Sequence, residues 1–431
     1  MSAVVARPRL LRGLPLVVVA VAASVLAYVL QGLGFADAVP SDVTLFAVLF
    51  GVTAVAGWAA VRWLAPRADP ILYPVAVLLS GLGLAMLFRL MVARGHPEIA
   101  QNQAIWLGVG LLCLIAVLWF VKDVRQLDAF TYTIGLAGVI LLLLPVLPGI
   151  GEVVNGARLW VRFGPIAFQP AEFGRVLIVI FLASYLAAKR ELLAEGVGRW
   201  GLPRAKDLGP LLMAWGLSLA VLFLERDMGA SLLLFGVFVV MLWVATGRPA
   251  YLWIGGLLFV LGALLGYLAF SHVQDRVDYW LHALDPATVH DIGYGQLAQS
   301  WFALASGGMV GTGLGQGSPT LIPYVGSDFI FSAFGEELGM LGTSALLLLY
   351  LVLVGRGLRI GVDQGNPFAK LLAVGITTTL ALQTFVIVAG VTRLIPLTGV
   401  PLPLVSYGGT SKVATFVMLG LLLRTSSGER T

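Results

Sequence analysis

The chain has 431 residues, of which 59% are hydrophobic and only 11% are charged, and its formal net charge is +5. A soluble domain carries about 25% charged residues, so this composition excludes an ordinary soluble protein. The apolar runs are continuous, which excludes the alternating strands of a transmembrane β-barrel. An all-α protein that crosses the membrane many times remains, because helices satisfy their own backbone hydrogen bonds in lipid.

Runs of about 20 apolar residues predict about twelve transmembrane helices. The first run follows three arginines, as a signal peptide would, but it is long for one and is interpreted as a retained span. In chain order the predicted spans cover residues 14–34, 43–65, 71–93, 103–121, 127–148, 168–187, 209–225, 227–246, 250–270, 329–355, 369–393 and 409–424.

Basic residues precede the first span and follow every second span, so the positive-inside rule places both termini in the cytoplasm. These residues are Arg7, Arg9, Arg12, Arg62, Arg67, Lys122, Arg125, Lys189, Arg190, Arg199, Arg204, Lys206, Arg248, Arg356 and Arg359. These basic residues beside the spans explain the net positive charge, which therefore gives no indication of nucleic-acid binding. The predicted location is the cytoplasmic (inner) membrane, as a multi-pass protein.

The unusual polar residues gather on the opposite, outer side. The segment 271–328 is the only sizeable extramembrane element, and connections of this length are usually functional or disordered. It opens with a predicted interfacial helix that carries Arg276. Its histidines, with His290 near its middle, match no zinc spacing. The single cysteine, Cys113, excludes a disulfide within the chain and a cysteine metal cluster.

The connection 149–167 and the helix start after it supply two candidate site residues. Arg158 can hold an anionic head group, although an arginine at this depth can also simply reach for the interface. Glu172 lies in the first turn after Pro170, where an acid often only compensates the helix dipole. Burial in lipid favours a functional role for Glu172.

A second candidate is the turn Glu225-Arg226-Asp227 between two spans. Asp227 can cap the next helix, and the turn can neutralise its own charge. The alternative is a cation or ligand site that faces the same vestibule as the 149–167 connection.

The segment from Ser327 to Gly339 is the most informative stretch of the chain. Asp328 stands where the outer segment meets the next helix, as a helix cap or as a general base. Glu336 and Glu337 follow about 12 Å deeper at helical rise. Charges at membrane depth cost a few kcal/mol each, which makes these acids functional candidates. We expect one of the pair to face the cavity beneath Asp328 and the other to brace a neighbouring helix.

The segment 394–411 is apolar but contains three prolines, which forbid a regular helix. Irregular backbone at membrane depth is tolerated only where protein or a water-filled cavity covers it, so a re-entrant loop is predicted. Ser406 and Tyr407 in this segment either contact substrate or pack in the core. For the brace of Glu336 or Glu337, Arg393 and Lys412 are the candidates.

Several of these segments together resemble the SEDS family (shape, elongation, division and sporulation) over roughly residues 71–425. Each segment alone is a weak signal, and their common order and spacing are specific. They are Asn155-Gly156-Ala157-Arg158, Phe168-Gln169-Pro170-Ala171-Glu172, Asp227-Met228-Gly229, Gly295-Gln296-Leu297-Ala298-Gln299-Ser300, Ser327–Phe331, Gly335–Gly339 and Pro396–Ser411. The stretch Asn155–Trp160 is similar to the actinobacterial branch, and more to the elongation type than to the division type.

The resemblance implies a glycosyltransferase that polymerises lipid II, the undecaprenyl-pyrophosphate-linked disaccharide-pentapeptide, into peptidoglycan strands. It also implies a partner, a class B penicillin-binding protein that crosslinks the strands. The family's key aspartate corresponds to Asp328. Substrate contacts are then expected from Arg158, Glu172, Asp227, Arg276, Gln299, Glu336, Glu337, Ser406 and Tyr407. A bound divalent cation, Mg²⁺ or Mn²⁺, would help Arg158 and Arg276 to offset the leaving group's charge.

The chain departs from the family pattern at several positions. Ala171, Arg175 and Ala230 replace the usual Ser, Lys and Thr, and residues 324–327 lack the acid and His that many members carry there. The family core has ten spans, so residues 1–66 form an additional N-terminal pair. Residues 67–425 form the core with its outer segment 271–328, and residues 426–431 form a cytoplasmic tail.

Two other functions remain open from the sequence: a lipid II flippase or other transporter, and a scaffold for the crosslinking enzyme. Transporters place their charges near the bilayer midplane between repeats. Here the charges crowd the outer face and no repeat is evident, which favours chemistry on a substrate that has already been flipped. We expect Arg158, Glu172 and Asp328 to line one cavity, open sideways to lipid.

Overall fold

The computed structural model describes residues 12–428 apart from residues 148, 155–156, 165, 196–212, 214–215, 218 and 221–222. Within these residues, ten helices are long and apolar enough to cross a membrane, and they coincide with ten of the predicted spans. This confirms the all-α membrane fold. About half of the predicted span 209–225 lies outside the described residues, as do Arg7, Arg9, Arg199, Arg204 and Lys206. The predicted span 409–424 forms a helix, Gly409–Ser427, which is not one of the ten, so the total of twelve stays a prediction.

The helices and strands follow one another along the chain as listed here. The helices are α1 (Leu14–Ala36), α2 (Val43–Leu64), α3 (Leu72–Ala93), α4 (Pro97–Phe120), α5 (Thr131–Leu143), α6 (Pro170–Glu195), α8 (Met228–Thr246), α9 (Ala250–Ala269), α10 (Ser271–His282), α11 (Ile292–Gly307), α12 (Ile330–Val362), α13 (Pro367–Val391) and α14 (Gly409–Ser427). Three 3₁₀ turns are η2 (Val124–Phe130), η3 (Leu144–Val146) and η4 (Pro319–Leu321), and the strands are β1 (Gly151–Val154), β2 (Ala157–Phe163) and β3 (Ile166–Phe168).

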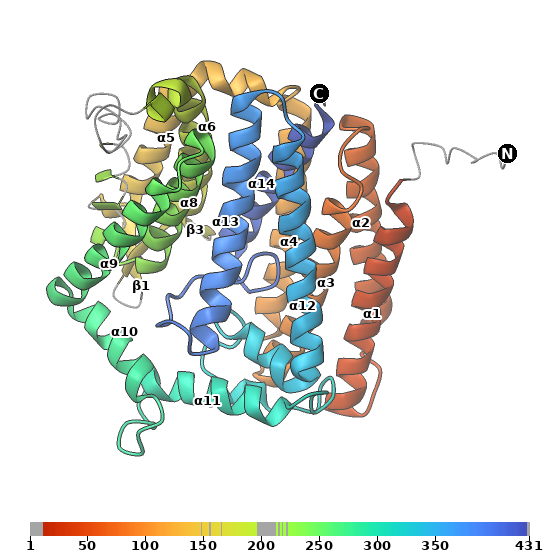
Figure 1. Cartoon of the computed structure of the whole chain (residues 1–431). Coiled ribbons are helices and arrows are strands. Elements are labelled where there is room, and N and C mark those ends of the chain that lie inside the picture. The colour runs from red at the N-terminus through yellow and green to blue at the C-terminus, as the bar shows by residue number, and fades with distance from the viewer. Residues whose placement is uncertain are drawn as a thin grey trace.

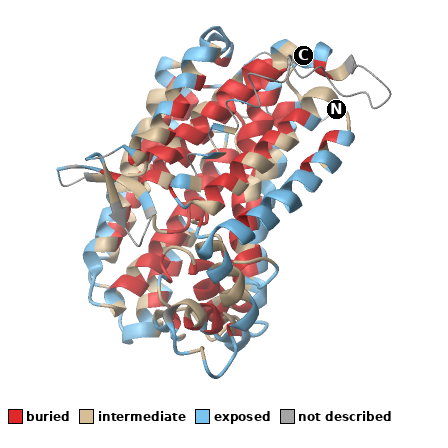
Figure 2. Ribbon diagram, turned by 90° about the vertical axis from the view of Figure 1, so that its left-hand side faces the viewer, coloured by how far each residue is buried: buried red, intermediate tan, exposed pale blue. Residues whose placement is uncertain are grey.

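The helices form one upright bundle in which α13 is central, packed against α6, α8, α12 and α14 (Figure 1). Over its most apolar 18 residues, α13 has 78% of its residues buried, against 11% for α9. Helix α9 packs mainly against α8 and α10. Buried residues concentrate in the interior of the bundle (Figure 2). The exposed side chains of α9 are almost all apolar, as expected of a helix that faces lipid. The start of α1 and the end of α14 lie at the same end of the bundle.

At the other end, α10 and α11 lie across the bundle rather than along it. Helix α10 begins directly after α9 and buries none of its residues, in agreement with the predicted interfacial helix. The connection 149–167 has regular secondary structure, which the sequence had not indicated. It contains a three-stranded antiparallel sheet in the order β1-β2-β3, in which Val161 pairs with Gly151 and with Phe168.

The predicted irregular segment is present between α13 and α14, and protein covers it. Side chains from three different helices hold its carbonyl groups. Gln383 donates to Pro401 O (2.8 Å), Tyr350 to Pro403 O (2.5 Å) and Gln103 to Ser406 O (3.0 Å). These bonds replace the helical bonds that the prolines remove, so non-helical backbone is tolerated inside the bundle.

Candidate active site

Asp328 opens into a cavity of about 450 Å³ at the end of the bundle that carries α10 and α11. Residues of α10 and α11 line one side of the cavity, and Leu397 of the irregular segment before α14 also lines it. Its lining residues are His272, Asp275, Arg276, Tyr279, Gln296, Leu297, Tyr324, Asp328 and Leu397. Asp328 is therefore accessible from one side and half-buried overall.

The carboxylate of Asp328 does not cap α12. The capping position is occupied by Phe329, with no side-chain hydrogen bond, and the Asp328 amide donates to Tyr324 O (3.2 Å). Burial raises the pKa of Asp328, Arg276 and a hydrogen bond from Ser327 oppose this shift, and the charge of Asp227 adds to it. A half-buried carboxylate with a raised pKa that faces a cavity is suited to accept a proton.

Arg276 is held beside Asp328 by the irregular segment. Its Nη1 donates to Leu397 O at 2.7 Å. A Cβ atom built on Gly399 would lie 3.6 Å from both terminal nitrogens of Arg276 and 3.9 Å from Oδ2 of Asp328. Gly399 has a φ of +75°, a conformation that glycine adopts without strain. The turn at Gly399 thus brings the cation and the acid together at one edge of the cavity.

Ser406 and Tyr407 contact the backbone that carries Asp328 rather than the cavity. The buried Ser406 hydroxyl donates to Ser327 O and accepts from Leu402 N (2.9 Å). The Tyr407 amide donates to Gly326 O at 2.8 Å. Neither residue is among those that line the cavity. In this structure both residues position the backbone next to Asp328, and a contact of either with substrate stays a prediction.

Glu337 braces the neighbouring helix α3, as expected, whereas neither Glu336 nor Glu337 lines the Asp328 cavity, which corrects the other half of our expectation. Glu337 is fully buried and pairs with Arg89 of α3 at 3.0 Å, and it accepts from Gly315 N (3.0 Å). Glu336 accepts from Ser318 N at 2.7 Å. The brace is therefore Arg89, and neither Arg393 nor Lys412 serves this purpose.

Helix α12 is interrupted immediately after these two acids. Gly339 has non-helical angles (φ 65°, ψ −165°). The freed backbone groups bond to the loop after α11: Thr312 N and Gly313 N donate to the carbonyls of residues 336 and 337, and Met340 N donates to Gly308 O (2.9 Å). The loop and the interrupted helix thus satisfy each other's backbone hydrogen-bonding groups, as irregular backbone at this depth requires.

Glu172 and Asp227 belong to a neighbouring cluster. Glu172 is buried, forms an ion pair with Arg175 and is hydrogen-bonded to Ser411. Asp227 caps α8 by accepting from Ala230 N (2.8 Å), as the capping interpretation predicted. Its charge acts on both Glu172 and Asp328, so Asp227 lies near both groups.

Arg158 and Gln299 are not in the cavity. Arg158 is exposed on β2, and the cavity lining includes neither it nor Glu172, so the expectation of one shared cavity is wrong. Gln299 is exposed on α11, whereas Gln296, one turn earlier, lines the cavity. Helical periodicity allowed either glutamine to face inward, and only the packing of α11 selected Gln296. His272, Asp275 and Tyr324 are further lining residues that the sequence did not identify.

The fold and this site define a class: a polytopic helical membrane protein with a carboxylate that faces a cavity at the end of its bundle that carries α10 and α11. The family of cell cycle proteins that includes FtsW, RodA and SpoVE matches residues 70–431. The peptidoglycan glycosyltransferase RodA of Mycobacterium tuberculosis is 44% identical over 403 residues, covering 91% of this chain and 85% of that protein. The probable peptidoglycan glycosyltransferase FtsW of Geobacter metallireducens is 32% identical, covering 84% and 95%.

Solved structures are similar over more than four fifths of the chain. One describes how a peptidoglycan synthase complex coordinates polymerization and crosslinking (TM-score 0.67, 27% identity, 83% of this chain and 97% of that one). Another is the rod shape determining protein RodA of Thermus thermophilus (TM-score 0.60, 25% identity, 85% and 98%). This chain belongs to the FtsW/RodA/SpoVE family, the SEDS family, and is a multi-pass protein of the cytoplasmic membrane.

Proposed function

We propose that this protein is a peptidoglycan glycosyltransferase that polymerises lipid II on the outer face of the cytoplasmic membrane, in cell elongation. The mycobacterial relatives that support this assignment bear the name RodA. The observation that carries it is the Asp328 carboxylate, which is free of helix capping and faces a cavity beside Arg276.

In the proposed reaction, Asp328 takes the proton from a hydroxyl group of the acceptor sugar. The hydroxyl oxygen forms a bond to the anomeric carbon of the donor sugar. The bond between that carbon and the pyrophosphate oxygen breaks, and undecaprenyl pyrophosphate leaves with the electron pair. Arg276 stabilises the negative charge on the leaving group, and its hydrogen bond to Leu397 O fixes it in place.

The described residues offer no complete set of ligands for a divalent cation. Among the residues that the structure describes, no group of three His, Cys, Asp or Glu side chains is arranged to hold a metal ion. The cavity itself offers the carboxylates of Asp275 and Asp328. These residues do not fit a metal centre held by the protein alone, and we derive no step through a cation.

The proposed partner is a class B penicillin-binding protein that crosslinks the new strands. Support comes from the similar structure described as a complex that coordinates polymerization and crosslinking. Polymerisation is therefore best measured with this partner present.

The test is lipid II polymerisation by Asp328→Asn in detergent with its partner. Loss of a general base typically lowers the rate by about 10²–10⁴. The matched control is Asp291→Asn, because Asp291 is an exposed acid of the same outer segment that makes no side-chain cap bond. Wild-type chain formation by Asp328→Asn would refute the assignment.

The same variant separates the two alternative functions. A flippase predicts no polymerisation by the wild type and translocation in sealed vesicles that persists in Asp328→Asn. A scaffold predicts that the substitution leaves both complex formation and growth intact.

A further inference from the structure

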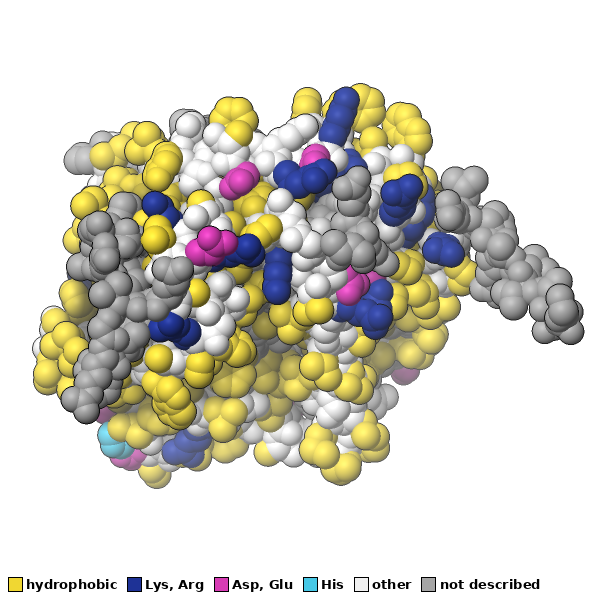
Figure 3. All heavy atoms as spheres, turned by 45° about the horizontal axis from the view of Figure 1, so that its top comes forward, with side chains coloured by type: hydrophobic (Ala, Val, Ile, Leu, Met, Phe, Trp, Pro, Cys, Tyr) yellow, Lys and Arg dark blue, Asp and Glu magenta, His cyan; other side chains and the backbone are white. Residues whose placement is uncertain are grey.

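A second hollow, of about 520 Å³, lies at the end of the bundle opposite the Asp328 cavity. Asp328 precedes the start of α12, whereas Gln364 in this hollow follows its end. Lysine and arginine side chains gather on this face (Figure 3). The hollow is lined by Arg67, Lys122, Asp123, Val124, Arg125, Gln364, Gly365, Asn366, Ala369, Arg424, Thr425, Ser427 and Gly428. We call it the basic pocket.

The basic pocket has more cations than its acid can neutralise. Its lining contains four basic residues and, among described residues, one carboxylate, Asp123. Asp123 already accepts from the amide (3.0 Å) and the Nε (2.7 Å) of Arg125. No ion pair is formed by Arg67, Lys122 or Arg424 within the described part of the chain. The basic pocket therefore carries an excess of positive charge that would attract an anion.

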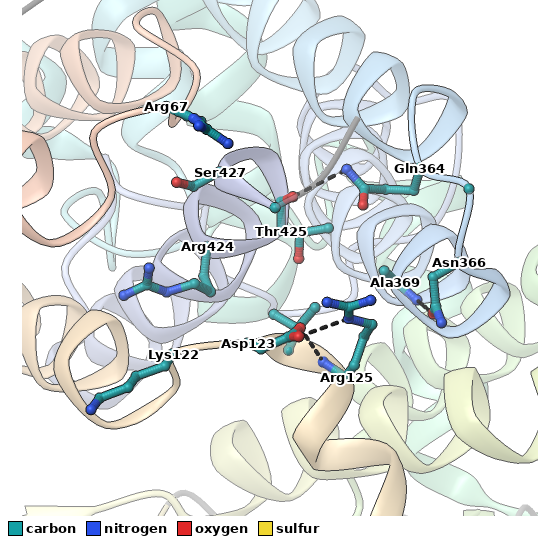
Figure 4. Close-up of a pocket in the computed structure, with 13 residues that line it drawn as sticks. Arg67, Lys122, Asp123, Arg125, Gln364, Asn366, Ala369, Arg424, Thr425 and Ser427 are labelled. Atoms are coloured by element: carbon teal, nitrogen blue, oxygen red, sulfur yellow. Dashed lines mark hydrogen bonds and ion pairs between the residues drawn. The ribbon is translucent and has the colours of Figure 1, made fainter. Parts of the chain in front are cut away.

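Topology alone does not account for this arrangement. The positive-inside rule requires basic residues on this face, but it does not require them to surround one hollow. Here the cations come from the connections after α2 and α4 and from the end of α14 (Figure 4). The start of α13 lies on the opposite wall, where Asn366 accepts from Ala369 N. Its positive helix end adds to the attraction for an anion.

The surroundings of the basic pocket indicate which anion it takes. Arg424 donates to Leu64 O (3.0 Å) and to Leu118 O, at the ends of α2 and α4. The residues adjacent to these two leucines, Trp63 and Trp119, form a ring pair with centroids 5.9 Å apart, and their exposed fractions are 73% and 54%. Exposed tryptophans at helix ends lie at the level of the lipid headgroups.

An apolar track runs from this aromatic pair into the membrane. On α4, Ile105, Leu112 and Trp119 are exposed at seven-residue spacing, so they share one face. The contacting helix α2 exposes Leu45, Leu49 and Val52 among others. Such an apolar surface accommodates acyl chains, whereas a soluble phosphate would make no contact with it.

We propose that the basic pocket binds the phosphate of an anionic phospholipid of the cytoplasmic leaflet, with its acyl chains along α2 and α4. Basic pockets between transmembrane helices on this side of a membrane are suited to such headgroups. Helix α14 begins directly after the segment that carries Ser406 and ends in this pocket. A lipid bound here stabilises the helix that anchors the irregular segment beside the Asp328 cavity.

The test measures lipid retention by native mass spectrometry on the purified full chain, with phosphatidylglycerol and phosphatidylcholine offered separately. The variant is Arg67→Gln/Lys122→Gln, because both side chains are exposed and their loss leaves the fold intact. Arg424 is kept, since it bonds to two helix ends. The control Arg190→Gln/Arg359→Gln removes the same charge from exposed cytoplasmic positions outside the pocket.

The wild type and the control are expected to retain phosphatidylglycerol in preference to phosphatidylcholine, and the pocket variant to retain at least about tenfold less. Equal retention by the pocket variant, or an equal loss in the control, would overturn the proposal. A second arm measures thermal stabilisation by inorganic phosphate. Stabilisation by phosphatidylglycerol alone supports the lipid, whereas equal stabilisation by inorganic phosphate identifies a soluble anion and overturns the lipid assignment.

Discussion

Arg89 of α3 and Glu337 of α12 form an ion pair of 3.0 Å whose side chains are 4% and 0% exposed. Arg89 also donates to Gly317 O at 2.6 Å, and Arg94 one turn later donates to Thr320 O and Ile322 O. Two arginines of α3 therefore hold the loop that leads to Asp328. The position of Asp328 depends on this loop, although neither arginine lines the cavity.

Glu337→Gln is expected to destabilise the protein by about 3–5 kcal/mol, because it leaves the Arg89 charge buried without its partner. Thermal unfolding in detergent measures this loss. The control is Glu191→Gln, which removes one partner of an exposed pair with Arg190 (3.7 Å) and should cost less than about 1 kcal/mol. A Glu337→Gln protein as stable as the wild type would show that the buried pair contributes nothing net.

Gly399→Ala is expected to lower the polymerisation rate more than it lowers stability. The new methyl group would lie in van der Waals contact with Arg276 (3.6 Å) and Asp328 (3.9 Å) and would occupy space beside them, and the φ of +75° costs about 1–2 kcal/mol for alanine. Gly149→Ala is the matched control, since Gly149 has a φ of +81° and nothing within 4 Å of its Cβ position. Equal rate losses in the two variants would mean that backbone strain alone is responsible.

The rate of polymerisation should fall on the acid side at a higher pH than an ordinary aspartate would give. Burial raises the pKa of Asp328, and a general base acts only when it is deprotonated. Arg276 opposes the shift, so Arg276→Gln should raise the pKa of Asp328 further and move the acid limb of kcat/KM toward neutral pH. A profile that keeps its position while only its height falls would contradict the electrostatic role of Arg276.

Removal of divalent cations should leave the stability of the substrate-free protein unchanged. No three potential ligands converge among the described residues, so Mg²⁺ or Mn²⁺ has no protein site through which to stabilise the native state. The measurement compares melting temperatures in EDTA, MgCl₂ and MnCl₂. A rise in melting temperature that saturates with metal concentration would reveal a site that this geometry does not contain.

The sequence alone determined the class of fold and the position of the key acid. Insertion into a membrane depends on the summed hydrophobicity of about 20 consecutive residues, so ten spans were predictable from local composition. Asp328 stood out because a charge beside an apolar helix is costly and therefore rare. The irregular segment before α14 was predictable because its prolines cannot donate the hydrogen bonds of a regular helix.

Only the tertiary structure decided which side chains meet. Glu337 finds Arg89, and Gln296 rather than Gln299 enters the cavity, because these choices depend on how helices distant in sequence pack and rotate. The break at Gly339 could not be predicted either, since its free backbone groups are satisfied by a loop from another part of the chain. The free energy of transferring about 20 consecutive residues into lipid selects the membrane spans. Contacts between the spans then bring the side chains of the site together.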